Sequence, residues 1–218
     1  MIALELNKYI DHTNLSRVGT KEDIEKLCKE AIKYRFASVC VHPYYVTLVK
    51  ELLSNSDVKV CTVIGFPLGM NTTEVKVYET ENALKNGADE IDMVINVAAL
   101  KNGEKYYVEN EIRQIREVVK NKILKVIIEE CCLTEDEIVT MTRICNECKV
   151  DFIKTSTGFD SHGATMEAVH IIRENKKDNV GIKASGGIRD YETAKKFISA
   201  GANRIGTSSG VKIMEGDK

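Results

Sequence analysis

The amino-acid sequence predicts a single-domain (β/α)8 barrel on three observations. Short runs rich in β-branched and apolar residues alternate with amphipathic stretches along the chain. Eight such runs recur about every 28 residues, the length of one strand-plus-helix unit. With only 2 prolines and no Gly/Ser-rich linker, no domain boundary is visible. We therefore expect one domain over residues 1–218, built from eight consecutive βα units.

The predicted strands are short and mostly apolar. Val126–Ile128 is an uninterrupted apolar run, as expected for a parallel strand that is covered on both faces. In chain order, the strands are expected at Tyr9–Asp11, Ser38–Val41, Lys59–Ile64, Glu90–Asn96, Leu124–Glu129, Phe152–Thr155, Gly181–Ala184 and Arg204–Gly206.

Helix start signals lie between these runs. Thr20 with Asp23 and Thr134 with Glu137 each resemble a capping box, in which two side chains satisfy the free N–H groups of a first helical turn. Pro43 suits the first helical position after the second strand, because its fixed φ favours a helix start.

Glycine placement bears on the helix ends and on the choice of architecture. Gly87 and Gly201 each follow an amphipathic run, where a left-handed residue commonly ends a helix. The alternative architecture is an open, doubly wound sheet, but no G-x-G-x-x-G follows the first strand. The closed barrel is therefore the preferred prediction.

The composition is that of an ordinary globular protein. Hydrophobic residues make up 43% and charged residues 29%, which excludes a disordered chain. A formal net charge of -2 argues against a nucleic-acid surface, which would be strongly basic. No apolar run approaches the roughly 18 residues that span a bilayer, and Met1–Tyr9 does not resemble a signal peptide. We expect a cytoplasmic protein that binds neither membrane nor nucleic acid.

The 7 cysteines are too irregularly spaced for a disulfide framework. Cys145 and Cys148 form a C-x-x-C, but no second pair completes a zinc set, and both continue a helical apolar stripe from Ile138. We interpret them as core residues. The adjacent Cys131 and Cys132 lie at a predicted strand end, with nothing beside them that indicates redox chemistry.

Two neighbouring predicted strands each contain a lysine, Lys154 in the sixth and Lys183 in the seventh. The active site of such a barrel lies at the carboxyl ends of its strands, and adjacent strands are about 4.8 Å apart. Two ammonium groups about 4 Å apart repel by about 4 kcal/mol, enough to lower the pKa of one amine by roughly 3 units and free it as a nucleophile. The alternative is that one or both lysines pair with carboxylates or extend out of the barrel.

Asp92 lies in the middle of an apolar strand and shares a face with Val94 and Asn96. A buried carboxylate is costly unless it is paired, as with a lysine. We therefore predict that Asp92 handles protons for an amine or a bound water. The alternative is a structural ion pair that neutralises the barrel core.

The last two βα loops are predicted to bind an anion. Ser185–Arg189 and Gly206–Gly210 are rich in glycine and hydroxyl residues, and barrels often hold phosphate at these two loops through backbone N–H groups. Metal-dependent chemistry would need several imidazoles around one ion, and the 4 histidines are not placed to converge. We therefore predict no metal.

Six strings span the chain from the first predicted strand to the last. They are IDHT (10–13), TVIGFPLG (62–69), EIDMVIN (90–96), KTSTGF (154–159), KASGGIR (183–189) and RIGTSS (204–209). Together they resemble the deoxyribose-phosphate aldolase family, and the two lysine strings are the most specific of them.

The resemblance implies a class I aldolase that works without a cofactor or a metal. Such an enzyme reversibly cleaves 2-deoxy-D-ribose 5-phosphate to acetaldehyde and D-glyceraldehyde 3-phosphate, in deoxyribonucleotide catabolism. By the resemblance, Lys154 forms a Schiff base with the C1 carbonyl, and Lys183 lowers the pKa of that amine. Asp92 matches the acid that relays protons together with a water.

The resemblance also implies the partners and the binding positions. The partners are a phosphorylated sugar and, in many members, a second copy in a homodimer, although no interface can be identified from the residues. His42 and Glu130–Cys132 depart from the family pattern, which bears on fine substrate preference. The 5-phosphate is expected at Gly158, Gly186, Gly187, Ser208 and Ser209, and Cys40 matches a pocket cysteine of some members.

Two rival functions stay open at this point. One is another Schiff-base aldolase that acts on a different phosphorylated sugar. The other is a barrel that binds sugar phosphates without catalysis. Lys154, Lys183 and Asp92 argue against the second, because a pure binding protein has no use for an activated amine.

Overall fold

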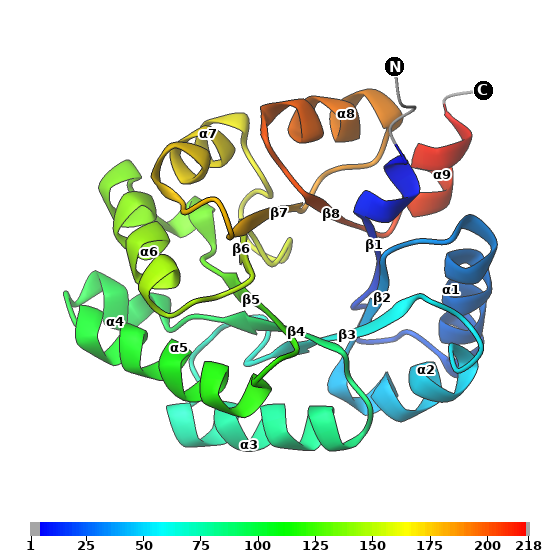
Figure 1. Ribbon diagram of the computed structural model, residues 1–218, viewed down its shortest axis with the longest axis horizontal. Helices are drawn as coiled ribbons and strands as arrows, with labels where there is room; N and C mark the ends of the chain where they lie inside the picture. The colour runs from blue at the N-terminus through cyan, green and yellow to red at the C-terminus, as the bar shows by residue number, and fades with distance from the viewer. Residues whose placement is uncertain (1–4, 217–218) are drawn as a thin grey trace.

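The eight predicted strands are parallel and close into a barrel. The computed structural model describes residues 5–216, so the outermost residues of the predicted domain lie outside its described part. The strands follow chain order around the barrel and β8 pairs with β1, which confirms the single-domain (β/α)8 barrel (Figure 1). They are β1 (Ile10–Asn14), β2 (Ser38–Val41), β3 (Lys59–Ile64), β4 (Glu90–Val94), β5 (Ile123–Ile127), β6 (Phe152–Lys154), β7 (Gly181–Ser185) and β8 (Arg204–Thr207).

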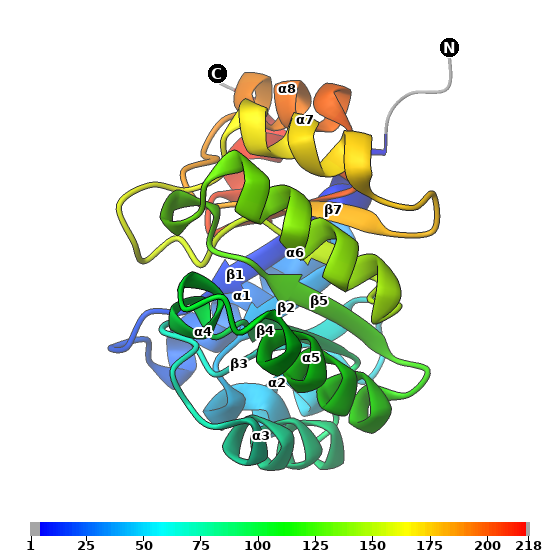
Figure 2. The same ribbon diagram turned by 90° about the vertical axis from the view of Figure 1, so that its left-hand side faces the viewer.

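Helices surround the barrel on its outside (Figures 1 and 2). The α-helices are α1 (Lys21–Tyr34), α2 (Val46–Leu52), α3 (Thr73–Lys85), α4 (Val97–Lys101), α5 (Lys105–Val119), α6 (Glu135–Glu147), α7 (Met166–Asn175), α8 (Tyr191–Ala200) and α9 (Gly210–Glu215). Short 3-10 turns are η1 (Leu6–Tyr9), η2 (Pro43–Tyr45) and η3 (Glu130–Cys132).

Strand boundaries differ from the prediction mainly at the carboxyl ends. β4 ends at Val94 rather than at Asn96, because the Asn96 side chain caps α4 by accepting from the Ala99 N–H at 3.0 Å. β5 ends at Ile127 rather than at Glu129, whose φ of 52° is incompatible with an extended strand. These polar ends turn out of the sheet and form the loops around the barrel mouth.

The predicted helix signals are confirmed with one change. Both capping boxes form in both directions, Thr20 with Asp23 and Thr134 with Glu137. Gly201 has the left-handed conformation directly after α8. Pro43 starts the 3-10 turn η2, and the α-helix itself begins three residues later.

The apolar core lies mainly between the strands and the surrounding helices. Ile91 and Met93 of β4 are buried in the same cluster as Ile112 and Ile115 of α5. Because successive strand side chains alternate between faces, Asp92 points the other way, into the barrel. Apolar packing outside the barrel thus sets the direction of the charged residues inside it.

Cys145 and Cys148 are buried in the apolar core, as predicted from their helical spacing. Within residues 5–216, no helix is both long and apolar enough to cross a lipid bilayer.

Candidate active site

A cluster of three lysines surrounds one carboxylate in the barrel interior. Asp92 accepts hydrogen bonds from Lys125 Nζ at 2.7 Å, Lys154 Nζ at 2.9 Å and Lys183 Nζ at 2.7 Å. The three lysines come from the consecutive strands β5, β6 and β7, and each is at most 3% exposed. The parallel register explains the convergence, because it pairs Asp92 with Lys125 and Lys154 with Lys183.

A second layer of charge lies beside this cluster. Asp11 Oδ2 forms an ion pair with Lys183 Nζ at 2.7 Å, and Asp11 Oδ1 accepts a hydrogen bond from Arg204. Glu90 lies 2.6 Å from Lys125 Nζ and 2.8 Å from Arg204 Nη2. The whole cluster contains four basic side chains and three carboxylates. The basic side chains are those of Lys125, Lys154, Lys183 and Arg204, and the carboxylates are those of Asp11, Glu90 and Asp92. If all seven groups are ionised, one positive charge is in excess. The site therefore favours one neutral basic group.

The lysines differ in how many carboxylates they contact. Lys125 pairs with Asp11, Glu90 and Asp92, and Lys183 pairs with Asp11 and Asp92. Among the described residues, Lys154 pairs with Asp92 alone. Lys154 is therefore the cluster lysine with the fewest carboxylates around its amine.

The pKa shifts of three other groups define the charges around the Lys154 amine. Burial tends to lower the pKa of Lys183, but the charges of Asp11 and Asp92 outweigh it and raise that pKa. The pKa of Lys125 is raised for the same reason, with burial opposing the nearby carboxylates. Burial would raise the pKa of Asp92, yet the three lysines hold it well below its usual value. Lys183, Lys125 and Asp92 are therefore all ionised at neutral pH.

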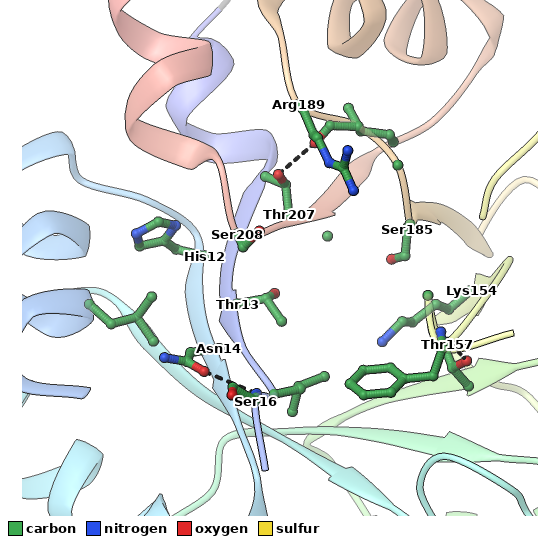
Figure 3. A pocket seen from close by; sticks show the side chains of 18 of the residues that line it. His12, Thr13, Asn14, Ser16, Lys154, Thr157, Ser185, Arg189, Thr207 and Ser208 are labelled. Carbon is green, nitrogen blue, oxygen red and sulfur yellow. Dashed lines mark hydrogen bonds between the residues drawn. The ribbon is translucent and has the colours of Figure 1, made fainter. Parts of the chain in front are cut away.

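A pocket of about 520 Å³ opens at the carboxyl ends of the strands. Lys154 lines it, whereas Lys125 and Lys183 lie below it in the barrel. In Figure 3 the Lys154 amine points into the pocket, with Thr13 on the facing wall and Ser185 and Thr157 nearby. A small molecule in this pocket can therefore reach Lys154 but not the other two amines.

Most of the predicted phosphate-binding residues come together in this pocket. Gly158, Gly186, Gly187 and Ser208 line it. The φ angles of the three glycines are 83°, 89° and 79°, which L side chains rarely adopt. A Cβ on Gly186 would lie only 2.7 Å from the Cα of Gly163, so two backbone segments touch there. The loops thus expose backbone to the pocket.

Two predicted binding residues lie elsewhere. Cys40 is fully buried beside Cys61 and Val63, and does not line the pocket. Ser209 lines a neighbouring hollow, and its N–H donates to Thr207 Oγ1 at 2.9 Å. Neither side chain borders the space beside Lys154.

Several residues of the charged cluster were not predicted from the sequence. Lys125 follows the same pattern as the two predicted lysines, a charged residue inside an apolar strand, so the same criterion would have found it. Asp11 was read only as part of a motif, although it also lies within a strand. Three further members of the cluster were not predicted: Glu90, Arg204 and Cys61, whose thiol donates to Asp92 at 3.1 Å. Two basic residues of the pocket wall, Lys26 and Arg189, were not predicted either.

Comparison with known proteins identifies relatives along almost the whole chain. The model of the DeoC/LacD family aldolases matches residues 6–216. A deoxyribose-phosphate aldolase of Streptococcus gordonii is 56% identical over 214 residues, covering 98% of this chain and 97% of that protein. One of Thermococcus gammatolerans is 55% identical over 220 residues, covering 99% and 98%. The tetrameric deoxyribose phosphate aldolase from Aeropyrum pernix superposes with a TM-score of 0.90 at 35% identity, covering 96% and 89%.

The closed parallel barrel with an amine-lined pocket defines a (β/α)8-barrel enzyme. The family match over residues 6–216 narrows this class of barrel enzymes to aldolases. The chain belongs to the DeoC/LacD family of aldolases, and its activity is that of a carbon–carbon lyase. The resemblance noted in its motifs is thereby confirmed.

Proposed function

We propose that the enzyme reversibly cleaves 2-deoxy-D-ribose 5-phosphate to acetaldehyde and D-glyceraldehyde 3-phosphate through a Schiff base on Lys154. One observation carries the proposal. Lys154 is the cluster lysine that both borders the pocket and contacts a single carboxylate. It thus combines access to substrate with the fewest carboxylate partners, which suits it to act as the nucleophile. The relatives named deoxyribose-phosphate aldolase support the choice of substrate.

The covalent steps follow from this placement. The Lys154 amine attacks C1 of the open-chain sugar, and the carbinolamine loses water to give an iminium ion. The C2–C3 bond then breaks, its electron pair moves into an enamine over C2 and C1, and the C3 hydroxyl loses its proton to become the new aldehyde. Protonation at C2 and hydrolysis release acetaldehyde and restore the amine. No metal or cofactor is required in this scheme.

Asp92 is placed to handle the protons of these steps. Its Oδ2 lies 2.9 Å from Lys154 Nζ, within reach of a proton moving to or from the nitrogen, directly or through one water. Lys183 donates to the same oxygen at 2.7 Å. We assign Lys183 the role of keeping a positive charge beside Lys154, which favours the neutral form of that amine.

The phosphate of the substrate is assigned to the opposite end of the pocket. Gly186 and Gly187 line the pocket with positive φ angles, and Gly158 and Ser208 line the same space, so backbone N–H groups are the donors that we assign to the phosphate. Arg189 and Lys26 supply positive charge at the pocket wall. We place Ser209 at the edge of this phosphate site and Cys40 behind the pocket wall, as a packing residue.

The proposal extends to assembly and to cellular role. We propose a homodimer, and a tetrameric relative shows that barrels of this kind assemble. We assign the reaction to deoxyribonucleotide catabolism in the cytoplasm. Sedimentation of the purified protein tests the first statement, and a monomer at micromolar concentration would contradict it.

Turnover on matched substrates tests the reaction itself. We expect cleavage of 2-deoxy-D-ribose 5-phosphate to be faster than cleavage of other phosphorylated sugars, and to be lost in Lys154→Ala. Faster cleavage of a different sugar phosphate would favour another Schiff-base aldolase. Retained turnover in the variant would exclude Lys154 as the nucleophile.

A further inference from the structure

Two cysteines and an aspartate form a cluster at the carboxyl end of the barrel, outside the pocket. Cys131 and Cys132 lie in η3 directly after β5, and Asp160 lies in the loop between β6 and α7. Figure 2 shows these parts of the chain at the same end of the barrel. Cys131 Sγ is 3.9 Å from Cys132 Sγ, which in turn is 3.6 Å from Asp160 Oδ2. The three ligand atoms all lie within 4.8 Å of one another.

These distances match the edges of a tetrahedral zinc site. Zinc binds thiolate sulfur at about 2.3 Å and carboxylate oxygen at about 2.0–2.2 Å. Two sulfurs on one tetrahedral ion are then about 3.8 Å apart, and a sulfur and an oxygen about 3.6 Å apart. Two edges of the cluster therefore have the required length before any ion is bound.

We propose that Cys131, Cys132 and Asp160 bind a thiophilic divalent cation of the zinc type. The two sulfurs and one carboxylate oxygen supply three ligands, and water fills the fourth position. Each thiol gives up its proton to solvent when the ion binds. Neither cysteine is fully buried and Asp160 is exposed, so an ion can enter from solvent.

The barrel interior also brings thiols and carboxylates together, but it does not suit a cation. Cys40, Cys61 and Asp92 are equally close to one another, and so are Asp11, Cys61 and Glu90. The carboxylates in these groups already pair with buried ammonium or guanidinium groups. A divalent ion would have to displace or repel those charges. The outer cluster has no such competitor among the interactions described for residues 5–216.

The outer cluster connects two loops, one of which contributes to the pocket. Gly158 and Phe159, directly before Asp160, line the pocket. The same loop is tied to the end of β5 by Glu129, which accepts from the Thr157 N–H at 3.0 Å. A bound ion would add a second link between these segments, and would therefore reduce opening of the loop at residues 156–165.

Metal titration of the whole protein, kept reduced and in metal-free buffer, tests the proposal without reference to activity. We expect one Co²⁺ per chain to give the near-ultraviolet absorption of thiolate-bound cobalt, and Zn²⁺ to displace it. In the Cys131→Ser/Cys132→Ser variant that absorption should vanish. Asp160→Asn should keep the thiolate absorption but weaken affinity by about tenfold or more, since even outer partners of metal ligands contribute that much.

Two controls make the result decisive. Cys61→Ala removes the thiol shared by both interior groups, and we expect it to leave Co²⁺ binding unchanged. Hydrogen exchange at residues 156–165 should slow on adding Zn²⁺ to the natural sequence, and should not respond in the double variant. Absence of a thiolate–cobalt band, unchanged binding in the double variant, or loss of binding in Cys61→Ala would each overturn the proposal. None of these readouts depends on the assigned aldol reaction.

Discussion

Lys154 and Lys183 are partners in the register between β6 and β7, and both donate to the same oxygen of Asp92. The two bonds are 2.9 Å and 2.7 Å, so their sum, 5.6 Å, is the largest distance at which the two nitrogens can lie. If both were charged, they would repel by about 3 kcal/mol or more at an effective dielectric near 20. Because Asp11 also holds Lys183 in its charged form, the repulsion falls on Lys154.

Replacing Lys183 tests this repulsion. Lys183→Leu leaves three basic groups facing three carboxylates and removes the positive charge that lies beside the Lys154 amine. We expect slower imine formation at neutral pH, and a pH–rate profile whose acid limb moves to higher pH. Stopped-flow measurement of imine formation between pH 5 and 10 gives both quantities.

A matched control separates charge from stability. Lys76 is as buried as Lys183 and pairs with Glu111 outside the pocket. Lys76→Met should therefore destabilise the fold by about 3–5 kcal/mol without moving the pH profile. A profile that is unchanged in Lys183→Leu, or shifted equally in both variants, would show that Lys183 does not set the charge state of Lys154.

Asp92→Asn tests the proton-handling role. The variant removes the charge that three lysines share, so we expect turnover to fall by roughly 100-fold or more while inorganic phosphate still binds. It should also lower the free energy of unfolding by about 3–5 kcal/mol, because among the described residues it removes the one carboxylate partner of the buried Lys154 and a shared partner of Lys125 and Lys183. Turnover and phosphate affinity are measured on protein whose folding is verified by circular dichroism. Equal losses in both would assign Asp92 a structural role only.

Two glycines of the same geometry test the phosphate site. Gly187 and Gly103 have φ angles of 79° and 78°, and a Cβ at either position would meet no atom within 4 Å. Only Gly187 lines the pocket. Alanine at either position should cost a similar stability, about 1 kcal/mol, from backbone strain.

Steady-state kinetics then separates the two variants. Gly187→Ala should raise KM for the phosphorylated substrate by about tenfold, because the new methyl group enters the space assigned to phosphate and one hydrogen bond to a charged group is lost. It should change KM for unphosphorylated deoxyribose little, and Gly103→Ala should change neither. An equal effect on both substrates would place the phosphate elsewhere.

Glu130 gives the protein a specific pH dependence of stability. Burial raises its pKa to about 7, and its Oε2 is buried without a hydrogen-bond partner within the described residues. Of its neighbours, His162 opposes this rise in the pKa of Glu130, whereas Glu129 adds to it. Because the folded pKa lies above the unfolded value of 4.5, folding favours the neutral acid. The contribution of Glu130 to the free energy of unfolding is therefore largest below pH 4.5, and it is lost as the pH rises to about 7.

Glu130→Gln mimics the neutral acid at every pH. We expect the variant to be more stable than the natural sequence at pH 8 by about 3 kcal/mol, since one pKa unit corresponds to about 1.4 kcal/mol. At pH 4 the two proteins should differ little. Urea unfolding at the two pH values measures this difference, and a gap that does not change with pH would refute the assignment.

The fold could be predicted from sequence because each βα unit carries its own local signals. Apolar runs locate the strands, and capping boxes such as Thr134 with Glu137 locate the helix starts. Strand ends were less predictable, because Asn96 and Glu129 leave the sheet for polar contacts that a residue pattern does not show. Such contacts depend on neighbours that are distant in sequence.

The site was predicted in part for a related physical reason. Lys154, Lys183 and Asp92 were recognisable as charged residues inside apolar strands. Lys125 has the same signature and was equally recognisable; what strands covered on both faces lack is the alternation that would tell whether such a residue points into the barrel. Only the closed register brings Asp11 and Lys125 into the same cluster.

Trapping with borohydride shows which lysine forms the Schiff base with the substrate. The enzyme is incubated with 2-deoxy-D-ribose 5-phosphate, reduced, and mapped by peptide mass spectrometry. We predict a reduced adduct on Lys154 alone. An adduct on Lys183 or Lys125, or no adduct from enzyme shown to be folded, would contradict it.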